Sequence, residues 1–185
     1  MTVTTFGGGS GGGSTLPSIT DNNNKFLYTD GKNISWKSSG FTLIQNQSGS
    51  FSTMTFGNIP QSYNHLKIVG HIDIGNGQTL SFTTNGFSNN YSGYLYHNGG
   101  TSWSGGGSNT HYLVPYIYAG GSSFELTIPH YKNNNNKAWQ CMSASVGTSY
   151  SFSLSGGNFS GSAINTINLN GSNSGNWNVS LYGLD

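Results

Sequence analysis

From Phe41 to the C-terminus the chain repeats one local pattern, in which short runs of alternating apolar and polar residues are separated by turn-forming residues. Leu66 and Ile68, with Lys67 between them, are an example of the two-residue period of a half-buried strand. No window of eleven residues shows the 3.6-residue apolar period of a helix. The pattern therefore predicts an all-β fold, a jelly-roll-like antiparallel β-sandwich preceded by an extended N-terminal arm. The predicted strands cover residues 41–44, 50–56, 65–74, 78–83, 91–97, 112–118, 123–128, 138–143, 150–154, 163–169 and 177–182.

The composition narrows the function classes. Gly (29), Ser (29) and Asn (24) make up 82 of the 185 residues, charged residues are 6%, and the net charge is +1. The six basic residues are all lysines, so a basic footprint for nucleic acid or for an anionic membrane is not expected. No stretch approaches 18 apolar residues, and the first residues do not resemble a signal peptide. Cys141 is the single cysteine, which excludes an internal disulfide.

The N-terminal part differs from the rest of the chain. Residues 7–14 read GGGSGGGS, a flexible spacer composition, and Asp30-Gly31 is a two-residue hairpin signal between short β-type runs. An isolated hairpin is marginal in water, so this hairpin should dock on its own domain or on a partner. The sequence thus predicts a Gly/Ser-rich arm with an anchoring hairpin at residues 1–40 and a jelly-roll sandwich at residues 41–185.

Residue types that perform chemistry are scarce. A glycosidase would need Asp73 and Glu125 to face each other at about 5 to 10 Å, but solvated strand carboxylates explain them better. His71 and Asp73 share one strand face, yet two side chains do not make a metal site, and the third ligand would have to be one of His65, His97, His111 and His130. Cys141 has no nearby base and is interpreted as a buried, inert thiol. We therefore expect no catalytic residues, no metal and no cofactor.

Aromatic residues offer one alternative to purely structural packing. Tyr94, Tyr96 and Trp103 precede the loop at residues 105–107 and could stack on the apolar face of a sugar. The same residue types pack β-sheet cores and subunit contacts. Packing is the favoured interpretation, and glycan stacking by these three residues stays open.

Several segments resemble, in the right order, a jelly-roll-like domain of bacteriophage virion proteins. Residues 56–68, FGNIPQSYNHLKI, resemble that family's opening F-x-x-I-P-Q-x-Y-x-H-L-x-I, and residues 180–184, SLYGL, resemble its closing S-L-Y-G-I. Between them, LSFTTNG at 80–86, NYS at 90–92, IPHY at 128–131 and AINTI at 163–167 are similar to further family segments. Upstream, residues 25–36 are similar to the K-x-L-x-x-D-G stretch and tryptophan that precede such domains in phage fibre and head proteins.

The resemblance implies a non-enzymatic structural protein of a virion, either a capsid decoration or head-fibre protein or, as the alternative, a tail fibre or appendage. A glycan-binding receptor-adhesion module is the rival from another class. The partner would be the major capsid protein or a tail protein, with a homo-oligomer expected, a trimer favoured, and a host surface glycan as a further candidate. The protein would be made in the host cytoplasm and lie on the virion surface. The residues expected to anchor it to the partner are Phe6, Leu16, Ile19, Leu27 and Trp36.

Overall fold

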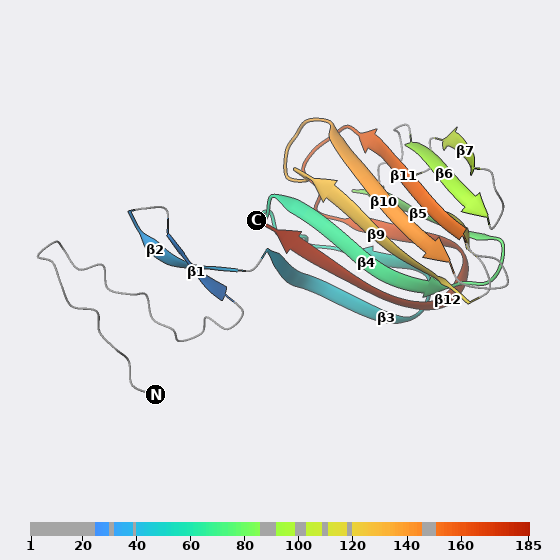
Figure 1. Cartoon of the computed structure of the whole chain (residues 1–185), viewed down its shortest axis with the longest axis horizontal. Helices are drawn as coiled ribbons and strands as arrows, with labels where there is room; N and C mark the ends of the chain where they lie inside the picture. The colour runs from blue at the N-terminus through green and yellow to red at the C-terminus, as the bar shows by residue number, and fades with distance from the viewer. Residues whose placement is uncertain are drawn as a thin grey trace, which may run out of the picture. The chain divides into compact units, whose positions relative to one another are not determined.

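The computed structural model describes residues 25–29, 32–38, 40–85, 92–98, 103–108, 111–117, 120–145 and 151–185. These residues form twelve β-strands and no helix (Figure 1). The strands are β1 (Lys25–Thr29), β2 (Ile34–Ser38), β3 (Phe41–Phe56), β4 (His65–Asp73), β5 (Gln78–Thr84), β6 (Ser92–Asn98), β7 (Trp103–Ser108), β8 (His111–Ile117), β9 (Ser122–Pro129), β10 (Lys137–Ser145), β11 (Ser151–Phe159) and β12 (Ile167–Leu184). The predicted all-β class is confirmed.

The chain divides into two structural units, residues 1–39 and 40–185. In the first unit, β1 and β2 pair as an antiparallel hairpin in which Thr29 lies opposite Ile34. The connection therefore consists of residues 30–33, two residues more than the Asp30-Gly31 turn that the sequence indicates. Of the arm and hairpin predicted at residues 1–40, residues 1–24 lie outside the described residues.

The second unit is one curled antiparallel sheet of ten strands. Nine strands follow the order β7-β6-β11-β10-β9-β4-β12-β5-β8, and β3 pairs with β12 outside that path. The first part of β12 (Ile167–Gly171) pairs with β5, while its second part (Asn176–Leu184) pairs with β4, and β3 accompanies both parts. β12 and β3 therefore pass from one layer to the other, and the two layers form an antiparallel sandwich (Figure 1).

Glycines make this passage between layers possible. The pairing of β12 with β3 shifts register between Asn170 and Gly175. A Cβ on Gly171 would lie 2.8 Å from Cζ2 of Trp177, and one on Gly175 would overlap the backbone oxygen of Asp73. Only glycine permits such close approach of the chain. The corner of the sandwich is therefore encoded by glycines within a strand.

Side chains from alternate positions of each strand fill the space between the layers. In β9, Phe124, Leu126 and Ile128 are buried while Glu125 and Thr127 are partly exposed. The other inward positions behave in the same way, and the core includes Met54, Phe56, Leu66, Ile68, Ile72, Leu80, Phe82, Trp139, Phe159, Ile167, Leu169, Trp177, Val179 and Leu181. The interior is partly polar near β11, where hydrogen bonds join Ser122 to Ser145 and Ser143 to Ser153.

The structure corrects three details of the sequence prediction. The two predicted strands at 41–44 and 50–56 are one strand, β3, and those at 163–169 and 177–182 become the single strand β12. Residues 105–107, interpreted as a loop tip, lie within β7. Asn85-Gly86 is an Asn-Gly pair, which in sequence is a signal for a tight hairpin, and Asn85 has a positive φ of 45°. The preceding strand, β5, nevertheless pairs with β12 and β8 and not with the next strand.

Candidate functional site

The outer surface of the larger layer carries the exposed apolar side chains of the second unit. We call this surface the front face, formed by β6, β11, β10, β9, β4, the second part of β12 and residues 41–47 of β3. All exposed large hydrophobic residues described in residues 40–185 lie on it, namely Phe41, Leu43, Val69, Leu95, Met142, Phe152 and Leu154. Their side chains are 38% to 55% exposed. An apolar concentration of this kind marks an interaction surface more often than an ordinary wet surface.

Strand register organises these residues into a ridge. Leu95 lies opposite Leu154, Leu154 opposite Met142, Met142 opposite Glu125, and Glu125 opposite Val69. Directly opposed residues of an antiparallel sheet project from the same face with their side chains in reach of one another. The ridge therefore runs across five strands, at right angles to the chain direction.

A second row runs beside the ridge and forms a lower floor. It begins with three glycines, Gly107, Gly93 and Gly156, and continues with Gln140 and Thr127. Because glycine has no side chain, the sheet surface lies open beside Leu95 and Leu154. One pocket of about 460 Å³ is lined by Gly93, Leu95, Gly106, Leu154 and Gly156 among others.

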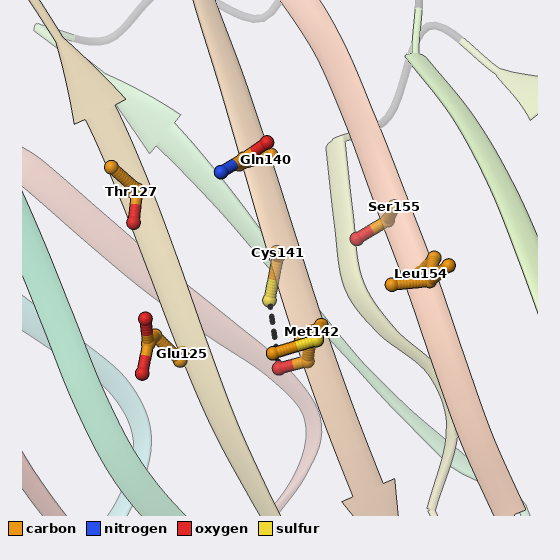
Figure 2. Close-up of a pocket in the computed structure, with 7 residues that line it drawn as sticks. All are labelled: Glu125, Thr127, Gln140, Cys141, Met142, Leu154 and Ser155. Carbon is orange, nitrogen blue, oxygen red and sulfur yellow. Dashed lines mark hydrogen bonds between the residues drawn. The ribbon is translucent and has the colours of Figure 1, made fainter.

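The neighbouring pocket, of about 340 Å³, continues the same groove toward β9. Figure 2 shows its lining, in which Met142 and Leu154 lie on one side and Gln140, Thr127 and Glu125 supply amide, hydroxyl and carboxylate groups. A third pocket of about 300 Å³ lies on the other side of the ridge and includes Phe152. The front face is therefore a ridge between shallow grooves.

Charge on this face is balanced locally. Lys67 Nζ lies 2.6 Å from Glu125 Oε1, and the same ammonium lies 5.0 Å from the ring centroid of Phe41. Phe41 in turn packs edge-on against Tyr182, with ring centroids 6.3 Å apart. His71 Nδ1 and Ser123 Oγ are 3.2 Å apart farther along the face. An exposed ion pair of this kind stabilises little, but it leaves the centre of the face without an uncompensated charge.

The opposite surface of the sandwich is different. We call the outer surface of β5, the first part of β12 and residues 53–55 of β3 the back face. It consists of two cross-strand rows, Thr83–Asn168–Thr55 and Ser81–Asn170–Thr53. Thr55 Oγ1 donates to Asn168 Oδ1 at 2.8 Å, and Ser81 Oγ donates to the backbone oxygen of Asn170 at 3.3 Å. The back face is thus polar, and Thr55, Asn168, Ser81 and Asn170 hydrogen-bond within it.

The predicted anchoring residues fall in the first unit. Leu27 and Trp36 lie directly opposite each other in the hairpin, so their side chains share one face. The other face carries Phe26 and Tyr28, which are 48% and 40% exposed, and Lys37 Nζ lies 4.5 Å from the Tyr28 ring centroid. Phe6, Leu16 and Ile19 lie outside the described residues. The hairpin therefore presents apolar groups on both faces.

Two of the three residues considered for glycan stacking, Tyr94 and Tyr96, lie on the inner side of β6. Tyr94 lies opposite Ser155, a buried residue of the inner side, and its ring packs edge-on against Tyr112 of β8 at 5.7 Å. Tyr96 stacks beside Tyr94 at 6.3 Å. The backbone of Trp103 lies opposite His97 at the edge of the sheet, and its side chain lies outside the described residues. The two tyrosines pack within the sandwich, while the ridge beside them is aliphatic.

The carboxylates considered for catalysis lie well apart. Glu125 is opposite Val69, and Asp73 is four residues farther along β4, a distance of roughly 13 Å along the strand. A glycosidase pair needs about 5 to 10 Å. His71 and Asp73 share the front face, as predicted, but among the described residues no three His, Cys, Asp or Glu side chains are grouped closely enough to hold a metal ion.

Burial determines the state of the single cysteine. Cys141 is 3% exposed and points into the sandwich. Desolvation raises its pKa to about 12, although hydrogen bonds lower it in part. The thiol is therefore protonated at neutral pH, as the sequence interpretation required. Within the part of the chain that the structure describes, no helix is long and apolar enough to cross a bilayer.

The front-face residues were absent from the sequence-predicted sites. A sequence signal is present in β10, where Trp139 and Cys141 at one phase and Met142 at the other are all apolar, so burying one phase exposes the other. In β11 the alternation misleads, because Ser153 and Ser155 are buried while Leu154 between them is exposed. No family model, curated protein or solved structure matches this chain.

Proposed function

We propose that this chain is a non-enzymatic structural protein of a bacteriophage virion, a capsid decoration or head-fibre protein that seats its front face across a seam between major capsid subunits. In this proposal the N-terminal unit anchors the chain and the sandwich covers the seam. The single observation that carries it is that the exposed apolar residues described in the second unit gather on one face. The resemblance to phage virion proteins supplies the identity of the partner.

The size of the front face supports a stable interface. Strands lie about 4.8 Å apart and rise about 3.3 Å per residue, so seven strands of about nine residues present on the order of 900 Å². A stable protein interface buries about 800 Å² on each partner. The face therefore has the area of one complete interface.

The chemistry of the face fits a protein partner. Its centre combines Leu95, Leu154 and Met142 with one internally compensated ion pair, Lys67–Glu125. Interface cores are depleted in charge and enriched in large apolar side chains, Met among them. Copies bound to many equivalent sites on a shell would also gain from the high local density of those sites.

Co-sedimentation with empty heads tests this proposal. Replacing Met142 and Leu154 together by lysine places two charges at the centre of the interface, and we expect binding to weaken at least about 100-fold. The matched control replaces Ser81 and Thr83 on the back face by lysine and should bind like the unchanged protein. Equal binding by both double variants would overturn the proposal, and displacement of the protein by soluble host polysaccharide would favour the adhesion alternative.

Deletion of residues 1–20 tests the anchoring role separately. We expect the truncated protein to be lost from the particles during sedimentation at low protein concentration, because it lacks the arm that tethers the sandwich to the particle. Full retention on the particle would show that the arm is not an anchor.

A further inference from the structure

The free edge of β3 forms the end of the front sheet. β3 pairs with β12 on one side, and no other strand among the described residues pairs with it. An unpaired strand edge exposes backbone N–H and C=O groups that can pair with a further strand. Proteins usually protect such an edge with lysine, proline or short length. β3 has sixteen residues with neither a charge nor a proline.

The two parts of β3 differ in protection. Gln47 Nε2 donates to the backbone oxygen of Thr55 at 2.7 Å, and Gln45 Nε2 donates to that of Gly57 at 2.6 Å. These amides occupy carbonyl groups at the second part of the strand, which belongs to the back layer. Among the residues that the structure describes, no side chain hydrogen-bonds to the backbone of residues 41–44. The open part is therefore the first one, at the end of the front face.

Apolar exposure is also greatest there. Leu43 is 55% exposed, more than any other large hydrophobic residue that the structure describes, and Phe41 is 51% exposed. Leu43 lies opposite Tyr182 and so projects from the front face. A register shift between Leu181 and Tyr182 leaves Ile44 as an extra residue, which limits the straight part of the edge to a few residues. Such an edge suits one short pairing rather than a growing fibre.

We infer that residues 41–44 of β3 pair antiparallel around Leu43 with the same residues of a second copy of this chain, so that the front sheet continues through a two-fold dimer. A second copy fits for two reasons. It supplies an uncharged strand whose other edge is already paired, and the two-fold arrangement uses both free edges and closes the assembly. Each copy brings Leu43 close to the Leu43 of the other, which shields the most exposed apolar side chain on both.

This arrangement has a consequence for the front face. A two-fold axis that relates antiparallel strands in one sheet stands perpendicular to the sheet, so each face maps onto itself. Both front faces then lie on the same side of the dimer. The inference goes beyond the proposed function, since dimerisation does not require a capsid partner, but a dimer would offer such a partner two docking faces at once.

Sedimentation equilibrium of the full-length protein without any particle tests the inference. We expect twice the chain mass of 19.6 kDa at micromolar concentrations. Leu43→Lys should raise the dimer dissociation constant about tenfold or more, because it removes an apolar cross-strand pair and places two like charges together. The matched control, Thr53→Lys, lies on the protected second part of the same strand and should leave the dimer intact.

Each other outcome overturns the inference. A monomer up to about 100 μM, the trimer that the sequence favoured, or a dimer that is sensitive to Thr53→Lys and not to Leu43→Lys would each exclude pairing through residues 41–44. A circular-dichroism melt of both variants confirms that they fold. The experiment contains no capsid, so its failure leaves the particle-binding test of the front face untouched.

Discussion

The two outer faces of the sandwich share two strands, β12 and β3, and yet differ in character. β12 and β3 contribute to both, but on the front face they lie among exposed Leu43, Val69 and Met142, and on the back face they form Thr and Asn rows. Hydrogen bonds among the back-face groups leave little to offer a partner. Polar residues on the front face would be compatible with the same fold. The fold alone therefore does not explain why the front face exposes apolar side chains.

The largest expected effect concerns the corner that separates the two faces. Gly175→Ala places a Cβ against the backbone oxygen of Asp73, and backbone cannot move aside as a side chain can. We expect a loss of about 3 kcal/mol or more in the free energy of unfolding. Chemical denaturation measures it.

Gly57→Ala is the control for the corner variant, because nothing described lies within 4 Å of a Cβ there. It should change the free energy of unfolding by less than about 1 kcal/mol. An equal loss in both glycine variants would mean that close packing at Gly175 does not hold the corner.

A second prediction separates the interior from the front face. Leu126→Ala removes a fully buried side chain of β9 and should destabilise the protein by about 2 to 5 kcal/mol. Met142→Ala, on the adjacent strand and 51% exposed, should change stability by less than about 0.5 kcal/mol. Thermal or urea unfolding compares them, and a large loss for Met142→Ala would mean that the ridge is part of the core rather than a docking surface.

Replacing Lys137, at one end of the sandwich, is expected to change the free energy of unfolding by a smaller amount. Lys137 is 2% exposed, and its ammonium donates to the backbone oxygens of Asn135, Gly161 and Ser162 at 3.0, 2.8 and 3.0 Å. Lys137→Met keeps the apolar stem and removes the donors, so we expect a loss of about 1 to 3 kcal/mol in unfolding free energy. Lys132→Met, on an exposed side chain of the same turn, should be nearly neutral, and equal losses would contradict a role for the three bonds.

The smallest effect concerns Cys141 and appears only in alkali. Its pKa is raised from 9.0 to about 12 in the folded protein, so the unfolded chain loses the proton first as pH rises. Stability is therefore unaffected below about pH 8 and falls between about pH 9 and 12. Urea unfolding of the unchanged protein and of Cys141→Ala should diverge only in that window, and parallel curves there would contradict the burial argument.

Much of the fold could be predicted from alternation, because strands such as β4 and β9 bury one phase and expose the other. The long strands could not, because Gly49 in β3 and Gly171 and Gly175 in β12 resemble turn residues although here they bend a continuous strand. The glycine run in β7 was missed for the same reason. Asn85 shows a related limit, since its side chain bonds Ala163, Asn165 and Thr166 instead of closing a hairpin.

The candidate site was harder to predict than the fold. Aromatic and titratable side chains are the usual sequence signals of a site, and here they point to Tyr94 and Tyr96, which pack on the inner side of β6. The front face depends instead on which residues of non-adjacent strands come into register. Leu95, Leu154 and Met142 are distant in sequence, and only the strand order β6-β11-β10 makes them neighbours.

Oxidation of Met142 tests the central claim most directly, because it reports the exposure of the front face without any amino-acid substitution. Met142 is 51% exposed and Met54 on β3 is 1% exposed, so dilute peroxide should oxidise Met142 in the free protein and spare Met54. Mass spectrometry of particle-bound protein is expected to show Met142 protected by about tenfold or more, as for a side chain at the centre of a dry interface. Equal oxidation of Met142 in the free and bound protein would contradict docking through the front face.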